Sequence, residues 1–346
     1  MSTLFAALGT ASNAMDALEQ AMGVVQNNVA NASTPGYVTQ TLQLNAALFD
    51  PSSNFWGGVQ AGNTQSDRNS FAENSVWAAN QQVGSATQRA SSLQALQSVF
   101  DVSGTSGIPG ALSTLYSAFS AWSNSSGSST AQQQVIAAAQ GVAQAFNSAA
   151  SSVGAIRTQT GQQTQSTVTA INNLTSQIAS INGQIRAGGK DDGGLQAQLY
   201  SNLEQLSNLV DISAQTENDG TVSVLMDGQV PLVMGQTQTW LSVTAVNPTG
   251  SSSAPPDQQI LTSNGDDVTS KTQGGQLGGL RQISNTVLPS LTGDPSQTGS
   301  LNQLAQSIAD RVNSLLTNGQ TSSGTPGMPL FAYSATSPTS VAQRFP

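Results

Sequence analysis

Apolar residues recur at intervals of three and four along most of this 346-residue chain, and the longest such run covers residues 130–186. Val135, Val142, Ile171, Ile178 and Ile185 all belong to it. Side chains three and four positions apart lie on one face of an α-helix, so the run predicts a single helix about 85 Å long at about 1.5 Å per residue. Helices of that length are typical of bundles and coiled coils.

Other segments repeat this helical pattern. The glycine-rich turn at 187–194 and the leucines from Leu195 to Leu209 predict a return helix, so the chain should form a long antiparallel helical hairpin. A helix over residues 71–100 is also predicted, with a shorter one from Leu112 to Trp122. The expected buried face of the former consists of Val76, Val83, Leu93, Leu96 and Phe100.

The N-terminal segment carries a narrower stripe, without a break in its alternating steps of four and three. Its members are Leu4, Leu8, Ala11, Met15, Leu18, Met22, Val25 and Val29. Such a seam favours one or two partner helices and hence a coiled-coil-like helix, although an ordinary amphipathic surface helix would show part of the pattern. Pro35-Gly36 should end the helix near Asn31, with an extended segment at 40–44.

From residue 211 the pattern changes to alternation. Short runs rich in Val, Ile and Leu are separated by Asp227-Gly228, a favoured two-residue hairpin turn. A Gly, Ser and Pro-rich stretch at 247–254 interrupts the strands, which resume with QQILTS at 258–263. GGQLGG at 274–279 should be a flexible return into helix. We therefore expect a small β module.

The expected fold class is mainly α with a small β module, arranged as an elongated multi-domain rod. Five regions are predicted: the N-terminal axial helix and Asn-rich linker at 1–44, a long helical-bundle domain at 45–210, the β module at 211–273, returning helices at 274–318, and a turn-rich, incomplete C-terminal segment at 319–346.

Composition excludes several kinds of chemistry. The chain has no His and no Cys, which excludes Ser-His-Asp triads, thiol nucleophiles, zinc fingers and disulfides. Its net charge of −9, with only nine Lys and Arg, argues against nucleic-acid or anionic-membrane binding. Charged residues make up 8% of the chain, so neighbouring copies would meet little like-charge repulsion. No run reaches a membrane span, and the N-terminus lacks a Sec-type signal.

The remaining candidates for chemistry are weak. Adjacent acids occur at Asp191-Asp192 and Asp266-Asp267, but adjacent carboxylates in Gly-rich loops do not by themselves converge on a cleft. The segment 274–279 lacks G-x-G-x-x-G spacing, and Lys190 is followed by Asp191 and not by Ser or Thr. The sequence therefore predicts no catalytic residue, no cofactor and no metal site.

The Asn-rich segment NNVANASTPGY at 27–37 resembles one shared by axial proteins of the bacterial flagellum. The later segments QSTVTAINNLTSQIASINGQI, LSNLVDIS, NDGTVSVLMDGQVPLV and GGQLGGLRQISNTVLP are together similar to hook-associated proteins of the FlgK type. The order and spacing of these segments match too, from Leu4 to about Phe331. The chain is thus identified as a member of that family, whose subunits join hook to filament.

The resemblance implies a secreted structural subunit, not an enzyme, at the hook-filament junction. Its implied partners are identical copies in a ring, the hook protein, the second junction protein, an export chaperone and the type III export apparatus. It assigns the assembly seam to Leu4, Leu8, Met15, Leu18, Met22, Val25 and Val29, and the axial motif to Asn27, Asn28, Asn31, Pro35, Gly36 and Tyr37. The family pairs its first helix with a C-terminal helix of the same chain. No heptad follows Leu316, so the usual C-terminal helix is expected to be lacking.

Three alternatives remain open at this point. Within the structural class, the chain could be another axial protein, either the hook protein or the second junction protein. From a different class, it could be a secreted adhesin whose β module binds a host ligand or glycan, although Trp240 is an isolated aromatic there. The third is a carboxylate-dependent glycosidase using Asp192 and Asp267.

Overall fold

The computed structural model describes residues 2–50, 55–100, 105–190, 192–246, 257–294, 298–321 and 323–333. The chain divides into two compact units. Unit 1 comprises Met1–Gln82 and Ala170–Trp240, and unit 2 comprises Val83–Thr169 and Leu241–Pro346. Helices α2 (Ser70–Val99) and α4 (Ser129–Gln184) contribute residues to both.

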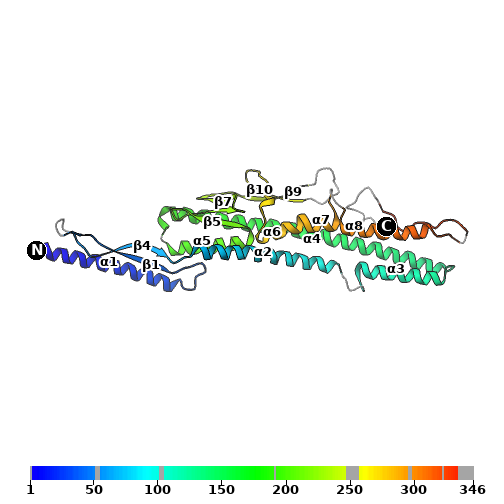
Figure 1. Cartoon of the computed structure of the whole chain (residues 1–346), viewed down its shortest axis with the longest axis horizontal. Helices are drawn as coiled ribbons and strands as arrows, with labels where there is room; N and C mark the ends of the chain where they lie inside the picture. Colours follow the sequence, from blue (N-terminus) through cyan, green and yellow to red (C-terminus); the bar gives the residue numbers. More distant parts are fainter. Residues whose placement is uncertain are drawn as a thin grey trace. The chain divides into compact units, whose positions relative to one another are not determined.

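Unit 1 begins with helix α1 (Ser2–Ala30), which lies beside an antiparallel hairpin (Figure 1). The hairpin pairs β1 (Gln40–Ala46) with β4 (Val59–Ser66), with an irregularity between Leu42 and Leu44. A smaller pair, β2 (Phe49–Asp50) and β3 (Phe55–Trp56), extends it. Asp67 N donates to Thr39 O at 3.0 Å and closes the base of the hairpin.

The rest of unit 1 combines helices with a four-stranded sheet. Helix α4 ends in a π-helical turn, η2 (Ile185–Gly189), after which α5 (Gly193–Leu209) returns alongside it. The strands follow in the order β5-β6-β7-β8, all antiparallel. Their bounds are β5 (Ile212–Thr216), β6 (Val222–Met226), β7 (Val230–Met234) and β8 (Thr237–Gln238).

One amide side chain ties this sheet to the long helix. Asn182 of α4 is fully buried and donates from Nδ2 to Val222 O at 2.9 Å and to Gly235 O at 2.7 Å. Its Oδ1 accepts from Val222 N at 2.9 Å. A buried backbone group without a partner costs free energy, so this amide satisfies three such groups while fixing where the sheet lies on α4.

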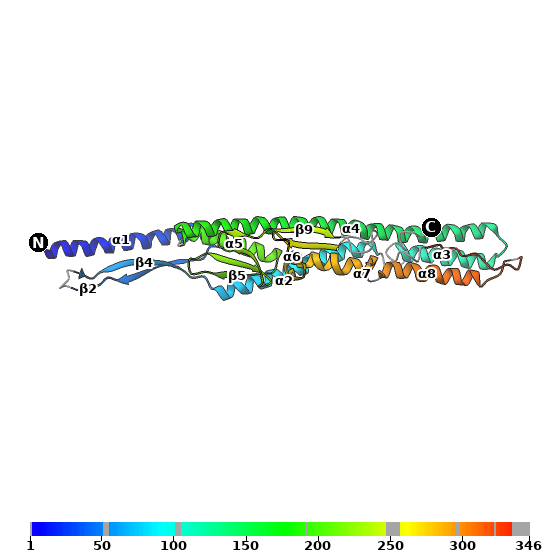
Figure 2. The ribbon, with the colours of Figure 1, turned by 90° about the horizontal axis from the view of Figure 1, so that it is seen from above.

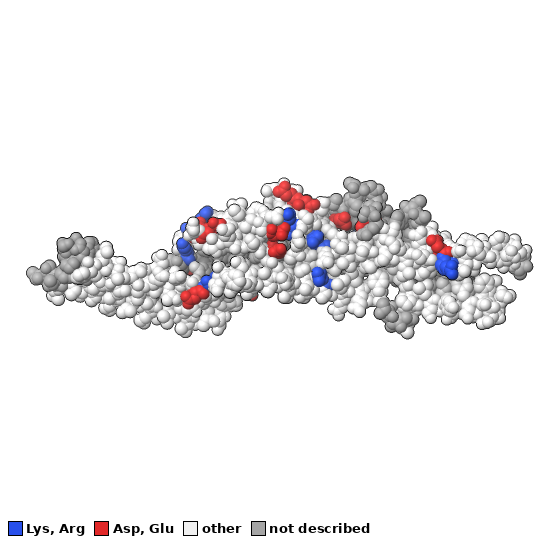
Figure 3. Space-filling model, viewed as in Figure 1, with Lys and Arg blue, Asp and Glu red and all other residues white. Residues whose placement is uncertain are grey.

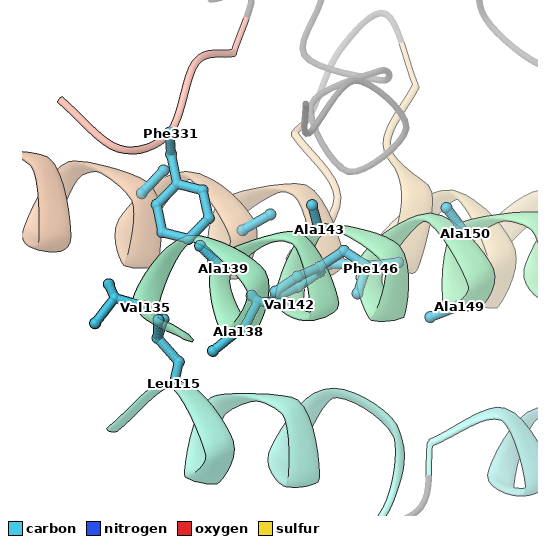
Figure 4. Close-up of a cluster of buried hydrophobic side chains, with 13 residues drawn as sticks. Leu115, Val135, Ala138, Ala139, Val142, Ala143, Phe146, Ala149, Ala150 and Phe331 are labelled. Carbon is cyan, nitrogen blue, oxygen red and sulfur yellow. The ribbon is translucent and has the colours of Figure 1, made fainter. Parts of the chain in front are cut away.

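Unit 2 is organised around helices α3 (Gly107–Asn124), α4 and α8 (Ser300–Thr317), which lie alongside one another in Figure 2. Figure 4 shows their shared core. Small residues of α4 such as Ala139 and Ala143 let the helices approach closely, and the fully buried ring of Phe146 fills the space between them. Phe331, 4% exposed, covers one side of this core.

The remaining elements of unit 2 are short. Strands β9 (Leu241–Val246) and β10 (Asp257–Thr262) form an antiparallel pair. A 3-10 turn, η3 (Thr269–Lys271), precedes α6 (Gly275–Gln282), the π-helical turn η4 (Ile283–Val287) and α7 (Leu288–Thr292). Leu96, Val153, Ile283 and Leu288 form a second buried cluster.

The main helical predictions are confirmed: α1, α2, α4 and α5 lie within a few residues of their expected positions. The turn at Asp227-Gly228 has positive φ at both residues, 52° and 64°, as a favoured hairpin turn requires. The fold class, mainly α with small antiparallel sheets, is as expected.

Other details differ from expectation. Strand β4 lies in the range 45–210 that was predicted as helical, because its uncharged polar residues show no apolar alternation. The predicted β module at 211–273 contributes β5–β8 to unit 1 and β9–β10 to unit 2. GGQLGG is helical from Gly275, with Gly278 and Gly279 buried, and is not a flexible return.

The buried face of α2 is also displaced from its predicted position. Val76, Val83 and Leu93 are 45–58% exposed, Leu96 is buried as predicted, and Trp77, which was not predicted, is buried as well. The stretch at 247–254 and the end of the C-terminal segment at 334–346 lie outside the described residues.

Candidate assembly surface and its linker

The predicted seam lies on one exposed face of α1. Exposure of its members ranges from 59% at Leu18 to 74% at Leu4. Leu8, Met15, Met22, Val25 and Val29 fall between these values. A continuous stripe of large apolar side chains left in water is costly in a monomer, and stripes of this kind mark interaction surfaces.

A second stripe on α1 explains why the hairpin leaves the seam uncovered. Small residues recur at steps of three and four and are partly or fully buried: Ala6, Thr10, Ala14, Ala17, Ala21 and Val24. Ala17 is 1% exposed. Gly58, next to β4, lies so close to Thr10 that a Cβ at Gly58 would be 2.8 Å from Thr10 Cγ2. The hairpin thus packs on the small-residue stripe, and the large-residue stripe stays free.

The Asn-rich motif links α1 to the hairpin mainly through Asn28. The Asn28 Oδ1 atom accepts from Tyr37 Oη at 2.8 Å and from Gln40 N at 3.0 Å. The Asn28 Nδ2 atom donates to Gln40 O at 2.9 Å. Both backbone groups of Gln40, the first residue of β1, are therefore held by one side chain in the last turn of α1.

Asn27 and Asn31 act more locally. The Asn31 Nδ2 atom donates to Asn27 O at 3.1 Å and to Asn27 Oδ1, and the Asn31 Oδ1 atom accepts from Thr34 Oγ1 at 3.2 Å. These hydrogen bonds give partners to backbone groups at the C-terminal end of α1, where the regular helical hydrogen bonds stop. Pro35 borders a groove of about 520 Å³ between the turn and helices α4 and α5.

Gly36 has two reasons to be glycine. Its φ of +77° is a conformation that residues with a Cβ rarely adopt. An added Cβ would also lie 2.4 Å from Ala197 O and 3.1 Å from Ser201 N, both in the backbone of α5. The motif is therefore in direct contact with the helical part of unit 1, and the structure brings Asn28, Gly36 and Tyr37 together around this turn.

Electrostatics contribute little to this surface. Residues 1–67 contain no Lys or Arg, and the face of α1 beside the seam carries only Asp16 and Glu19. Figure 3 shows few charged atoms on the visible face of this region. Partial burial raises the pKa of Tyr37, so its hydroxyl stays a hydrogen-bond donor to Asn28.

Sequence reasoning missed one residue of the linker, Arg68. It lies between β4 and α2, its side chain is 9% exposed, and its guanidinium carbon lies 3.7 Å from the centroid of the Tyr200 ring. The signal was present, because Arg68 is the first Lys or Arg of the sequence. An isolated arginine between a long polar segment and a predicted helix indicates a residue with a specific structural role.

The carboxylates considered as catalytic candidates accept hydrogen bonds from nearby backbone N–H groups instead. Asp192 caps α5, its Oδ1 accepting from Gly194 N at 2.7 Å and from Leu195 N at 3.2 Å. Asp267 Oδ1 accepts from Thr269 N at 2.9 Å and from its hydroxyl at 2.5 Å. Asp191 lies outside the described residues.

The described part of the chain contains no group of three or more carboxylates arranged to hold a metal ion. None of its helices combines the length and the apolar character needed to span a bilayer.

Two family models match the chain. Residues 93–331 match the helical domain of the flagellar hook-associated protein FlgK, and residues 8–37 match the flagella basal body rod protein. The second match contains most of the seam and all of the Asn-rich motif.

Known relatives agree with these matches. The flagellar hook-associated protein 1 of Salmonella typhimurium is 25% identical over 93% of this chain and 58% of its own length. That of Bacillus subtilis is 25% identical over 65% of this chain and 48% of its own. The structure of the flagellar hook junction protein FlgK from Burkholderia pseudomallei matches with a TM-score of 0.63 and 29% identity, over 76% of this chain and 47% of that one. The chain thus spans about half the length of these relatives.

Proposed function

The chain belongs to the FlgK family of flagellar hook-associated proteins, and we propose that it is a structural subunit that works at the hook-filament junction by packing against copies of itself. The observation that carries the proposal is the uncovered seam of α1. Its large apolar side chains are 59–74% exposed while the neighbouring stripe of the same helix is covered. A subunit stacked in an assembly would bury this seam against sister helices.

We propose that the Asn-rich motif fixes how this helix joins the rest of unit 1. Support comes from Asn28, which binds both backbone groups of Gln40, and from Gly36, which lies against the backbone of α5. These contacts involve no charged group of the motif, so they do not depend on ions in the surrounding medium.

The proposed location is the bacterial flagellum outside the cell. The proposed partners are identical subunits in a ring, the hook protein, the second junction protein, an export chaperone and the type III export apparatus. Family membership supports them. We also propose that the protein acts without catalysis, because the candidate acids Asp192 and Asp267 are engaged as backbone caps.

The test compares two double variants in cells whose only copy of the full-length gene is the altered one. Leu8→Gln with Met15→Gln places polar groups in the seam, whereas Asn13→Gln with Gln20→Asn changes exposed polar residues elsewhere on α1. Exposed positions contribute little to folding, so both variants should keep the thermal stability of the unaltered protein.

We expect the seam variant to lose filament attachment and swimming, and the control to retain both. Secreted protein in the medium shows whether export took place. Normal motility of the seam variant would contradict the proposed function.

A further inference from the structure

The Arg68 side chain is 9% exposed and lies where three segments of unit 1 meet. One terminal guanidinium nitrogen, Nη2, donates to Gly36 O in the turn after α1. The other, Nη1, pairs with the Glu73 carboxylate in the first turn of α2. The face of the guanidinium lies on the Tyr200 ring of α5.

The contact continues beyond Arg68 into the helices. The ring of Tyr200 stacks on that of Trp77 of α2, with centroids 6.1 Å apart and an angle of 23° between the ring planes. Trp77 is 5% exposed. The Arg68 side chain therefore rests on Tyr200 of α5, which stacks in turn on Trp77 of α2.

The N-terminal segment, defined as residues 2–66, is joined covalently to the rest of unit 1 by the link at 67–69, which contains Arg68. The turn at 31–39 within the segment, which contains Gly36, contacts the backbone of α5. The bond from Arg68 to Gly36 O connects the link to this turn, and the stacking on Tyr200 places Arg68 against α5. This segment carries the seam.

We propose that Arg68 is a positioning residue that sets the direction of the N-terminal segment relative to α5. The inference rests on the proposed function, because direction matters only if the seam must meet other subunits. Lysine could not replace Arg68: an ammonium group can neither present two nitrogens in a planar fork nor lie flat on a tyrosine ring.

The direction can be measured on the isolated full-length protein. The sequence has no cysteine, so Gln20→Cys and Gln205→Cys introduce unique, exposed sites for spin labels on α1 and α5. The distance distribution between the labels is recorded by pulsed electron resonance. The backgrounds are the unaltered chain, Arg68→Gln, Arg68→Lys and the control Arg89→Gln, whose exposed side chain bonds Gln282 at 3.2 Å.

We expect one narrow distance distribution in the unaltered chain and in the Arg89→Gln control. Both Arg68 variants should lose that single peak and give a broad distribution, while the circular dichroism spectrum stays helical. An unchanged distribution in Arg68→Gln overturns the proposal. Recovery of the narrow peak by Arg68→Lys also overturns it, because charge alone would then be sufficient.

Assembly in cells separates this proposal from the proposed function. If Arg68→Gln broadens the distances and reduces filament attachment, the positioning role is supported. If it broadens the distances but attachment is normal while the seam variant fails, Arg68 sets the direction of the segment but assembly does not need that direction, so the link to assembly is overturned and the proposed function stands. If the seam variant also attaches filaments normally, the proposed function itself is wrong, and the distance data alone decide whether Arg68 holds the segment.

Discussion

At the residue scale, Gly36 combines a positive φ with a close approach to the backbone of α5, so a side chain there is disfavoured for two reasons. Gly36→Ala would place a methyl group 2.4 Å from Ala197 O and would keep a residue with a Cβ at a φ of +77°. Backbone strain of this kind costs about 1–3 kcal/mol, and the clash adds to it. We expect a lower free energy of unfolding, measured by chemical denaturation.

The matched control for Gly36 is Gly23, which lies inside α1 and has no neighbouring atom within 4 Å of the position that a Cβ would occupy. Gly23→Ala should leave stability unchanged or raise it by about 0.5–1 kcal/mol, because glycine is a poor helix former. Equal effects of the two substitutions on the free energy of unfolding would mean that the close contact between Gly36 and α5 does not affect stability.

Asn182 provides a second test at this scale. Asn182→Ala would leave Val222 N, Val222 O and Gly235 O without this partner, and a buried polar group left unsatisfied costs about 1–3 kcal/mol. We expect the free energy of unfolding to fall by at least about 2 kcal/mol. The exposed Asn173 of the same helix is the control, and Asn173→Ala should change it by less than about 0.5 kcal/mol.

Single residues show where sequence reasoning succeeds and where it fails. The placement of each seam residue on one face of α1 was predictable, because apolar spacing on a helix depends only on local geometry, and their role in assembly stays a prediction. Asn28 could be singled out by its motif, but its partner Gln40 could not, since that pairing depends on how the chain turns between them. Arg68 and Tyr200 are 132 positions apart, and no local pattern links two such residues.

At the scale of elements, the turn between β5 and β6 should respond to acid through Asp219. The hydroxyl and the amide of Thr221 donate to this carboxylate, Arg186 pairs with it at 2.9 Å, and together they lower its pKa to about 2. A lowered pKa means stability that is present above about pH 4, the unfolded value, and is lost as the pH falls through about 2. Asp219→Asn should therefore melt at a lower temperature than the unaltered protein at pH 5. The difference between the two melting temperatures should become smaller as the pH falls towards 2.

Asp211, just before β5, should behave with the opposite sign. Burial raises its pKa, and the nearby Asp227 carboxylate raises it further. A raised carboxyl pKa means that stability is lost as the pH rises through the folded value, because the ionised form is disfavoured in the fold. Asp211→Asn should then melt at a higher temperature than the unaltered protein at pH 7. A lower melting temperature would show that ionised Asp211 makes a favourable contact.

Elements also differ in how much the sequence reveals about them. Helices α1 and α4 were predicted from the spacing of their apolar residues alone, and the β6–β7 turn was predicted from Asp227-Gly228. Strand β4 was not, because it packs on the small residues of α1 and needs no large apolar side chains of its own. The buried face of α2 was misplaced for a related reason: Trp77 packs against Tyr200, a partner that the helix's own period does not specify.

At the scale of the whole molecule, the low charge content predicts how association depends on salt. Only 8% of the residues are charged, and the net charge is −9. Added salt screens repulsion between like-charged copies and removes few attractions, since the described residues of the seam form no ion pairs. Self-association of the full-length protein, measured by sedimentation, should hold or strengthen as sodium chloride rises from low to high concentration. A strong fall would indicate docking through ion pairs.

The three hydrogen bonds of Asn28 have a mechanical consequence. A pull on α1 reaches β1 by two routes: along the backbone of the turn at 31–39, and directly through the amide of Asn28 to Gln40. The second route is shorter, so it takes up tension before the turn can straighten. Its bonds to Gln40 N and O are loaded side by side and share the force. A single asparagine thus shields the turn at 31–39 from tension applied to α1.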